Sequence, residues 1–156
     1  MNVTVRKEVV RCKKCGNKVV FLYISDFSYG ERLALYNNGK KYAYISLLKD
    51  KTYNQFVRQI ETILQKYKKN ILKDRKQDIV DKTFNIACDD IEESNVEFKG
   101  KRKCENCGSE EFEDLLVEPE QIVNVDIPQI THKNWDLLSE DEREHTLIKM
   151  LENYWR

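Results

Sequence analysis

The amino-acid sequence predicts an α+β fold, and three observations support that prediction. Runs rich in valine, isoleucine, tyrosine and phenylalanine occupy much of residues 3–47, as is typical of β-strands. From residue 53 onward, apolar residues recur at steps of three and four, which is the period of an amphipathic helix. Two Cys-x-x-Cys pairs are separated by 88 residues, 16–103. A chain of 156 residues is long enough to bury a core as one domain or a small two-part unit.

The two cysteine motifs have the same form, a Cys-x-x-Cys pair followed by glycine. They read CKKCG at residues 12–16 and CENCG at residues 104–108. Four thiolates are the full ligand set of a tetrahedral zinc site, with Zn–S distances of about 2.3 Å. Glycine after each pair can adopt positive φ without steric cost, which lets backbone N–H groups approach the sulfurs. The sequence therefore predicts one structural Zn²⁺ ion bound by Cys12, Cys15, Cys104 and Cys107.

These paired motifs resemble the zinc-ribbon family, in which two small hairpins are clamped on one metal ion. Strand-like runs on both sides of the first motif, at residues 3–10 and 19–24, form the hairpin that the resemblance implies. In compact four-cysteine sites about 15–20 residues separate the two pairs, so the longer gap here implies a ribbon with a long insertion. The resemblance implies metal binding and is not specific for one function.

A redox or disulfide role is the alternative interpretation of the cysteine pairs. A thioredoxin-like Cys-x-x-Cys lies between a strand and the start of a helix. Here β-forming residues follow Cys15, and an acidic, mixed segment at 109–114 follows Cys107. This context favours zinc over redox chemistry. The fifth cysteine, Cys88, falls on an apolar helical stripe, where we interpret it as a small buried hydrophobic residue.

Four strands are expected in the first third of the chain, in two pairs separated by a loop at 26–31. They span residues 3–11, 18–25, 32–36 and 41–47. The last two strands are joined through residues 37–40, which include Asn38 and Gly39. Asn-Gly is a strong signal for a type I′ hairpin, because both central residues of that turn need positive φ.

Two helices are expected in the middle of the chain, where the apolar spacing changes to three and four residues. The first covers residues 52–69, with Asp50 or Thr52 as its N-cap. The second covers residues 74–92. A short strand at 96–98 then leads into the second cysteine motif.

The C-terminal third is expected to hold two extended runs and an amphipathic helix. The runs at 112–117 and 122–127 are bounded by prolines, which fit turns or edge strands. Ser-Glu-Asp-Glu at 139–142 is a capping box that opens the helix. The predicted organisation is a zinc-ribbon module (1–25 and 96–130), an inserted hairpin plus two-helix unit (26–95) and a C-terminal helix (131–156).

Charge is balanced over the whole chain but unevenly distributed along it. Residues 1–82 sum to +11 and residues 83–156 to −11. Such asymmetry indicates that the halves attract each other or that one presents a charged face to a partner. The N-terminus has no apolar signal segment, and no apolar run approaches the roughly 18 residues of a membrane span. We therefore expect a cytoplasmic protein without membrane contact.

Motifs for catalysis are weak in this sequence, so it favours a non-enzymatic role. There is no Gly-rich phosphate loop and no Gly-x-Ser-x-Gly, and the only histidines are His132 and His145. A four-thiolate site also leaves no open metal position. Glu97-Phe98-Lys99, with Asp89 and Asp90 upstream, has the residue types of a metal-dependent nuclease site. Nuclease activity is therefore a remote alternative.

Another protein is the expected partner. A closed zinc site without catalytic groups is most simply part of a protein-binding module, such as an adaptor, an inhibitor, or an immunity- or antitoxin-like protein. Tyrosine and tryptophan often anchor interfaces, and the candidates here are Tyr42, Tyr44 and Trp155. The alternative is a nucleic-acid-binding regulator that uses a basic rim around the motifs. The rim residues are Lys13, Lys14, Lys101, Arg102 and Lys103.

Overall fold

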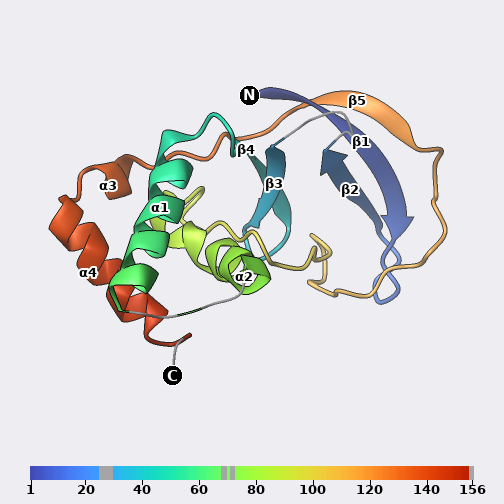
Figure 1. Ribbon diagram of the computed structural model, residues 1–156. Helices are drawn as coiled ribbons and strands as arrows, with labels where there is room; N and C mark the ends of the chain where they lie inside the picture. Colours follow the sequence, from blue (N-terminus) through green and yellow to red (C-terminus); the bar gives the residue numbers. More distant parts are fainter. Residues whose placement is uncertain (25–29, 68–69, 71–72, 155–156) are drawn as a thin grey trace.

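The computed structural model describes residues 1–24, 30–67, 70 and 73–154, and it combines helices with antiparallel sheets, as the predicted α+β class requires (Figure 1). Most of the predicted loop at 26–31 lies outside the described residues. A three-stranded sheet occupies one side of the molecule, the helices gather on the other side, and a two-stranded hairpin lies between them. Within the described residues, no helix combines the length and the apolar character needed to cross a membrane.

The three-stranded antiparallel sheet consists of β1 (Asn2–Arg11), β2 (Lys18–Ile24) and β5 (Gln121–Asp126), in the order β2-β1-β5. The two predicted N-terminal strands are confirmed. Because β1 is central, Val5 faces Ile24 of β2 on one side and Val123 of β5 on the other. Val5 is fully buried, in a small apolar cluster that links the sheet to Tyr44 of the neighbouring hairpin.

The hairpin consists of β3 (Glu31–Tyr36) and β4 (Lys41–Ser46), as predicted. Four residues, 37–40, connect the strands as predicted, because Tyr36 pairs with Lys41. They agree with the predicted type I′ turn, since Lys40 N–H donates to the Asn37 carbonyl at 3.2 Å across Asn38 and Gly39. Three of them, Asn37, Asn38 and Gly39, have positive φ. A side chain on Gly39 would also collide with the carbonyl oxygen of Lys101, so glycine allows the segment before the second motif to approach closely.

The first predicted helix is confirmed as α1 (Lys51–Lys66), and Asp50 is its N-cap, since its Oδ1 accepts from the N–H of Tyr53 at 2.7 Å. The second predicted helix, 74–92, is too long. Helix α2 (Lys73–Thr83) is followed by a 3₁₀ turn, η1 (Phe84–Ala87). This turn buries Phe84 and Ala87 in the same core as α2, so the apolar spacing continues although the α-helix has ended.

Two predicted extended segments are not regular strands. Glu97 makes only an isolated bridge with Leu35, and Phe112 makes only one with Cys12. The short strand predicted at 96–98 is therefore wrong. The run at 112–117 follows β1 irregularly before β5 begins.

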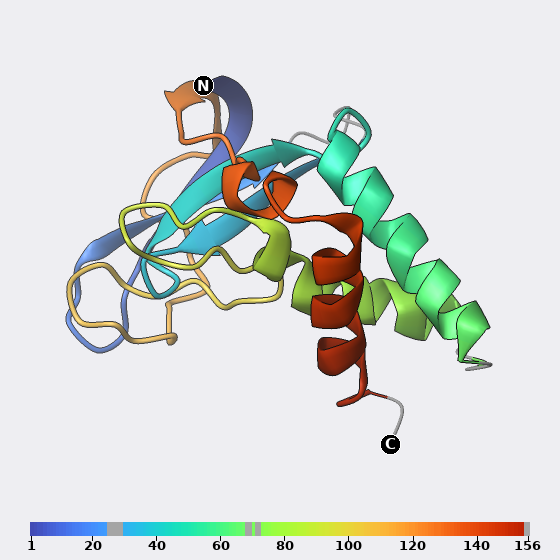
Figure 2. The same ribbon diagram turned by 90° about the vertical axis from the view of Figure 1, so that its left-hand side faces the viewer.

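Two helices close the fold, α3 (Lys133–Asp136), which sequence patterns did not indicate, and α4 (Glu140–Leu151). Ser139 and Glu142 form a complete capping box at the start of α4. Figure 2 shows α4 beside α1. Together with the β3–β4 hairpin, these helices enclose the main core, in which Phe56, Phe84 and Leu147 are almost completely buried.

Candidate metal centre

The two cysteine motifs fold into the same backbone loop. In the first, Gly16 N–H donates to the Cys12 carbonyl at 3.0 Å, and in the second Gly108 N–H donates to the Cys104 carbonyl at 2.9 Å. Both glycines have positive φ, +78° and +75°. Open space surrounds the position of a Cβ at each glycine, so it is the φ angle that favours glycine there. We call these two loops the knuckles.

The four sulfurs of the knuckles form one compact cluster. Cys12 Sγ lies 3.5 Å from Cys107 Sγ, Cys15 Sγ lies 3.6 Å from Cys104 Sγ, and all four sulfurs are within 4.8 Å of one another. Tetrahedral coordination with bonds of about 2.3 Å places sulfurs roughly 3.8 Å apart. The donor set and its spacing therefore fit one tetrahedral metal ion.

The redox alternative fits this geometry less well. The short sulfur–sulfur distances run between the knuckles, whereas a redox pair would join the two cysteines of one motif. Both distances are also far longer than the roughly 2.05 Å of a disulfide bond. Among the described residues, the cluster is the only group of three or more cysteine, histidine or acidic side chains close enough to share a metal ion.

Comparisons with protein-family models, with curated proteins and with solved structures give no significant match. The resemblance to zinc ribbons therefore depends on the two knuckles and on their sulfur cluster alone.

Backbone pairing brings the distant knuckles together. Lys13 N–H donates to the Glu111 carbonyl at 3.0 Å, and Glu113 N–H donates to the Arg11 carbonyl at 2.9 Å. Beneath the sulfurs, the rings of Phe21 and Phe112 meet edge to face with centroids 5.0 Å apart. The chain after the second knuckle is thus held against the chain around the first, which positions the cysteines.

The acidities of the thiols differ within the cluster. The N–H of Cys15 donates to the sulfur of Cys12 and lowers its pKa, and the N–H of Asn17 helps to lower the pKa of Cys15 to about 6. Cys107 accepts from the N–H of Ser109, yet burial and the neighbouring sulfurs raise its pKa to about 11. Clustered thiolates repel one another, so a bound cation is what allows all four to ionise together.

The predicted basic rim is only partly a surface feature. Lys13 and Lys14 are exposed at the tip of the first knuckle, and Lys101 is exposed before the second, where it pairs weakly with Glu110 at 3.9 Å. Lys103 is half-buried, and its Nζ donates to Asn38 Oδ1 at 2.9 Å. The three exposed lysines are accessible to a negatively charged partner, whereas Lys103 is less accessible.

Arg102 is a correction to the prediction, because its side chain is only 7% exposed. Its guanidinium donates to the carbonyls of Gly39 (3.2 Å) and Val20 (3.4 Å) and lies 5.3 Å from the ring centroid of Tyr42. It also pairs with Glu105 at 3.3 Å. Arg102 therefore ties the second knuckle to β2 and to the hairpin. Sequence reasoning missed this role because these partners are distant in the chain.

The predicted tyrosine contacts are also mostly internal. Tyr44 is 4% exposed and donates to the carboxylate of Glu31, and burial raises its pKa to about 12. It is unavailable as a surface contact, so that prediction is wrong. Tyr42 is half-buried, and its hydroxyl accepts from the N–H of Leu22 at 3.3 Å. Trp155 lies outside the described residues.

His132 is a structural residue, buried between α1 and η1. Its Nδ1 lies 2.7 Å from the Ala87 carbonyl and its Nε2 lies 2.8 Å from Asp50 Oδ2. Both partners are acceptors, so both ring nitrogens donate when the imidazole is protonated. Burial alone would lower the pKa of His132, but these bonds outweigh it and raise the pKa.

The acidic residues of the nuclease alternative do not form a common metal site among the described residues, and Asp89, Glu97 and Lys99 make structural contacts instead. The carboxylate of Asp89 accepts from the backbone N–H groups of Lys133 and Asn134 at 2.7 and 3.0 Å. Lys99 pairs with Asp78 at 3.2 Å. Glu97 is held by backbone bonds to Leu35.

Proposed function

We propose that this protein is a binding module for another protein, built around one structural Zn²⁺ ion. The observation that carries the proposal is a set of exposed apolar side chains on the segment that follows the second knuckle. Leu115 is 80% exposed, Ile122 65% and Leu116 42%. Single exposed apolar residues are ordinary, whereas several on one short segment mark an interaction surface.

Zinc is the metal that the donor set favours. Soft thiolate ligands in a tetrahedral arrangement suit Zn²⁺, and four of them fill every coordination position. Such an ion has no place for water or substrate, so its role is to hold the knuckles together. The exposed segment at 109–122 is then presented on a fixed base.

A tagged pull-down from native lysate tests the binding role, with half of the sample treated with nuclease. We expect one protein at stoichiometric yield in both halves. Loss of the ligand after nuclease treatment would contradict the proposal, as would recovery of no specific protein. Leu137→Ser is a matched control for Leu115→Ser, because Leu137 is 84% exposed but lies in the helical half. Only the Leu115 variant should lose the partner.

Nucleic-acid binding is the second candidate, and the exposed lysines Lys13, Lys14 and Lys101 favour it. Charge reversal of Lys13 and Lys14 together tests nucleic-acid binding. Arg102 is left unchanged, since reversing this buried charge would disturb the fold. If nucleic acid is the ligand, this change weakens binding and reduces its dependence on salt. Equal affinity of the variant and the wild type would exclude that face.

A further inference from the structure

Strand β5 forms an open edge of the three-stranded sheet. It lies outside β1 in Figure 1, and no second strand pairs with it among the described residues. In an antiparallel pair, alternate residues bond to the partner strand. Ile127 N–H donates to the Met1 carbonyl at 2.9 Å. In this register the backbone N–H and C=O groups of the odd-numbered residues of β5 therefore point toward β1. The backbone N–H and C=O groups of Ile122 and Asn124 therefore point away from the sheet.

The chain before β5 extends this edge and displays leucines from it. Glu113 N–H donates to the Arg11 carbonyl and Val117 N–H donates to the Val9 carbonyl, at 2.9 and 2.8 Å. Between these two bonds β1 advances by two residues and the edge segment by four, so the edge segment bulges by two residues. The extra residues leave Leu115 as one of the most exposed apolar side chains described.

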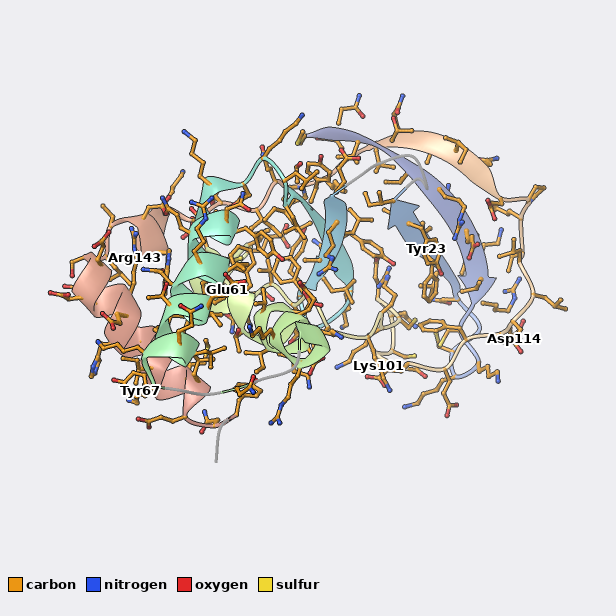
Figure 3. The ribbon with its side chains drawn as sticks, viewed as in Figure 1. Tyr23, Glu61, Tyr67, Lys101, Asp114 and Arg143 are labelled. Atoms are coloured by element: carbon orange, nitrogen blue, oxygen red, sulfur yellow. The ribbon has the colours of Figure 1, made fainter. Side chains whose placement is uncertain are left out.

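All charged side chains along this edge, residues 108–126, are acidic. Residues 108–126 include seven acidic and no basic side chains. Four of the acids have cationic partners elsewhere in the chain: Glu110, Glu118, Glu120 and Asp126. Glu111, Glu113 and Asp114 are exposed, and no ion pair links them to another described residue. Asp114 projects at the outer margin of the molecule, far from the helices (Figure 3).

We propose that this edge binds an extended, basic segment of a partner protein as a fourth strand of the sheet. The proposal rests on the proposed function and names the chemistry of the partner. Backbone groups of the segment pair with Ile122 and Asn124, and its apolar side chains cover Ile122 and Leu115. Its lysines or arginines meet the acidic residues at 111–114. Pro119 and Pro128 flank β5, which limits regular pairing to a short segment.

The direct test uses a synthetic seven-residue peptide in which lysine alternates with valine, titrated into the zinc-loaded full chain and followed by fluorescence anisotropy. We expect binding that weakens with added salt. Two control peptides have glutamate in place of lysine, or N-methyl groups on alternate backbone nitrogens. Each should bind about tenfold or more weakly, because one repels the acidic edge and the other cannot pair. Equal binding of all three peptides, or no binding of the first, would overturn the proposal.

The matching protein variant is Asn124→Pro. Its N–H points away from β1, so proline removes no backbone hydrogen bond within the sheet but blocks an added strand. The substitution also removes the side-chain bond that Thr4 Oγ1 donates to Asn124 Oδ1 at the exposed face. We expect it to bind the lysine–valine peptide about tenfold or more weakly and to keep its metal, whereas Leu137→Ser should bind as the wild type does. If Asn124→Pro does not fold, the N-methylated peptide still decides the question on the unmodified protein.

Pull-down with the same variant separates this inference from the proposed function. Recovery of one stoichiometric protein by wild type and by Asn124→Pro alike would place the partner elsewhere and overturn the edge proposal alone. Recovery of no protein by either would overturn the binding role itself. Recovery by wild type only, together with the peptide result, supports both.

Discussion

The helical half and the knuckle end of this molecule are held together by different means. Among the described residues, the main core contains seventeen buried residues, most of them from the hairpin and the helices, and Phe56, Ile60 and Leu147 are almost completely buried in it. The cluster under the knuckles contains four, and two of these are Cys12 and Cys104. A region with so little apolar surface to bury needs another source of stability, and metal binding is a common one in small folds.

The largest expected effect comes from breaking the knuckle end. Cys104→Ser removes one of the four proposed ligands, and structural zinc sites contribute about 10–16 kcal/mol of apparent binding free energy. We expect loss of the metal and a large fall in thermal stability. Hydrogen exchange should rise first around the knuckles, at residues 10–21 and 102–113, while α1 stays protected. Metal analysis and a melting curve check this.

Cys88→Ala is the matched control, because Cys88 is half-buried against the main core and lies outside the sulfur cluster. It should retain one metal ion per chain. Unchanged metal content and melting temperature in Cys104→Ser would refute a single shared site.

The reverse experiment breaks the helical half. Phe56 is completely buried and packs against Phe84 with ring centroids 5.2 Å apart. Phe56→Ala should lower the free energy of unfolding by about 3–5 kcal/mol, the usual cost of such a cavity. Metal stoichiometry below the melting temperature should not change. A Phe56→Ala protein that loses its metal while still folded would show that the two regions are not separable.

Short-range patterns predicted the parts of this molecule that depend on neighbouring residues. The CxxCG motifs predicted the grouping of the four cysteines, and Asp50 before an apolar helical stripe predicted the start of α1. These features depend on φ preferences, caps and side-chain period, which a short window of sequence contains.

Features that depend on distant partners were not predictable in the same way. Arginine usually lies on the surface. Arg102 is buried because the backbone at Gly39 and Val20, distant in the sequence, packs against its side chain. The short α3 is too brief for a periodic pattern, and Asp89, distant in the chain, accepts hydrogen bonds from its first N–H groups. The end of α2 was missed because η1 continues the apolar spacing with a different backbone.

A smaller effect on stability is expected from the buried Asp50–His132 pair in the helical half. Its pH dependence distinguishes an electrostatic contribution from apolar packing. The Asp50–His132 pair raises the pKa of the histidine despite its burial. A pKa raised by folding stabilises the protein below the unfolded value of about 6.5, and this stabilisation is lost as the pH rises through the folded value. His132→Gln should therefore cost most near pH 6, about 1.5–3 kcal/mol, and less near pH 8.5.

Urea unfolding at both pH values measures this difference. His145→Gln is the control, since His145 is exposed on α4. A cost for His132→Gln that stays constant or grows with pH would show that the bonds do not need the protonated ring.

The smallest expected effect tests how evenly stability is spread over the helical half. Ser139 Oγ accepts from the N–H of Glu142 at 3.1 Å and caps the acidic first turn of α4. Removing such a cap costs about 0.5–2 kcal/mol, so Ser139→Ala should lower the melting temperature modestly and leave metal content unchanged. Thr146→Ala is the control, because that hydroxyl donates to the Glu142 carbonyl within α4 and so caps no helix end. If Ser139→Ala instead destabilises the protein as much as Phe56→Ala does, then α4 is required for the core to form, and packing around Phe56 depends on it.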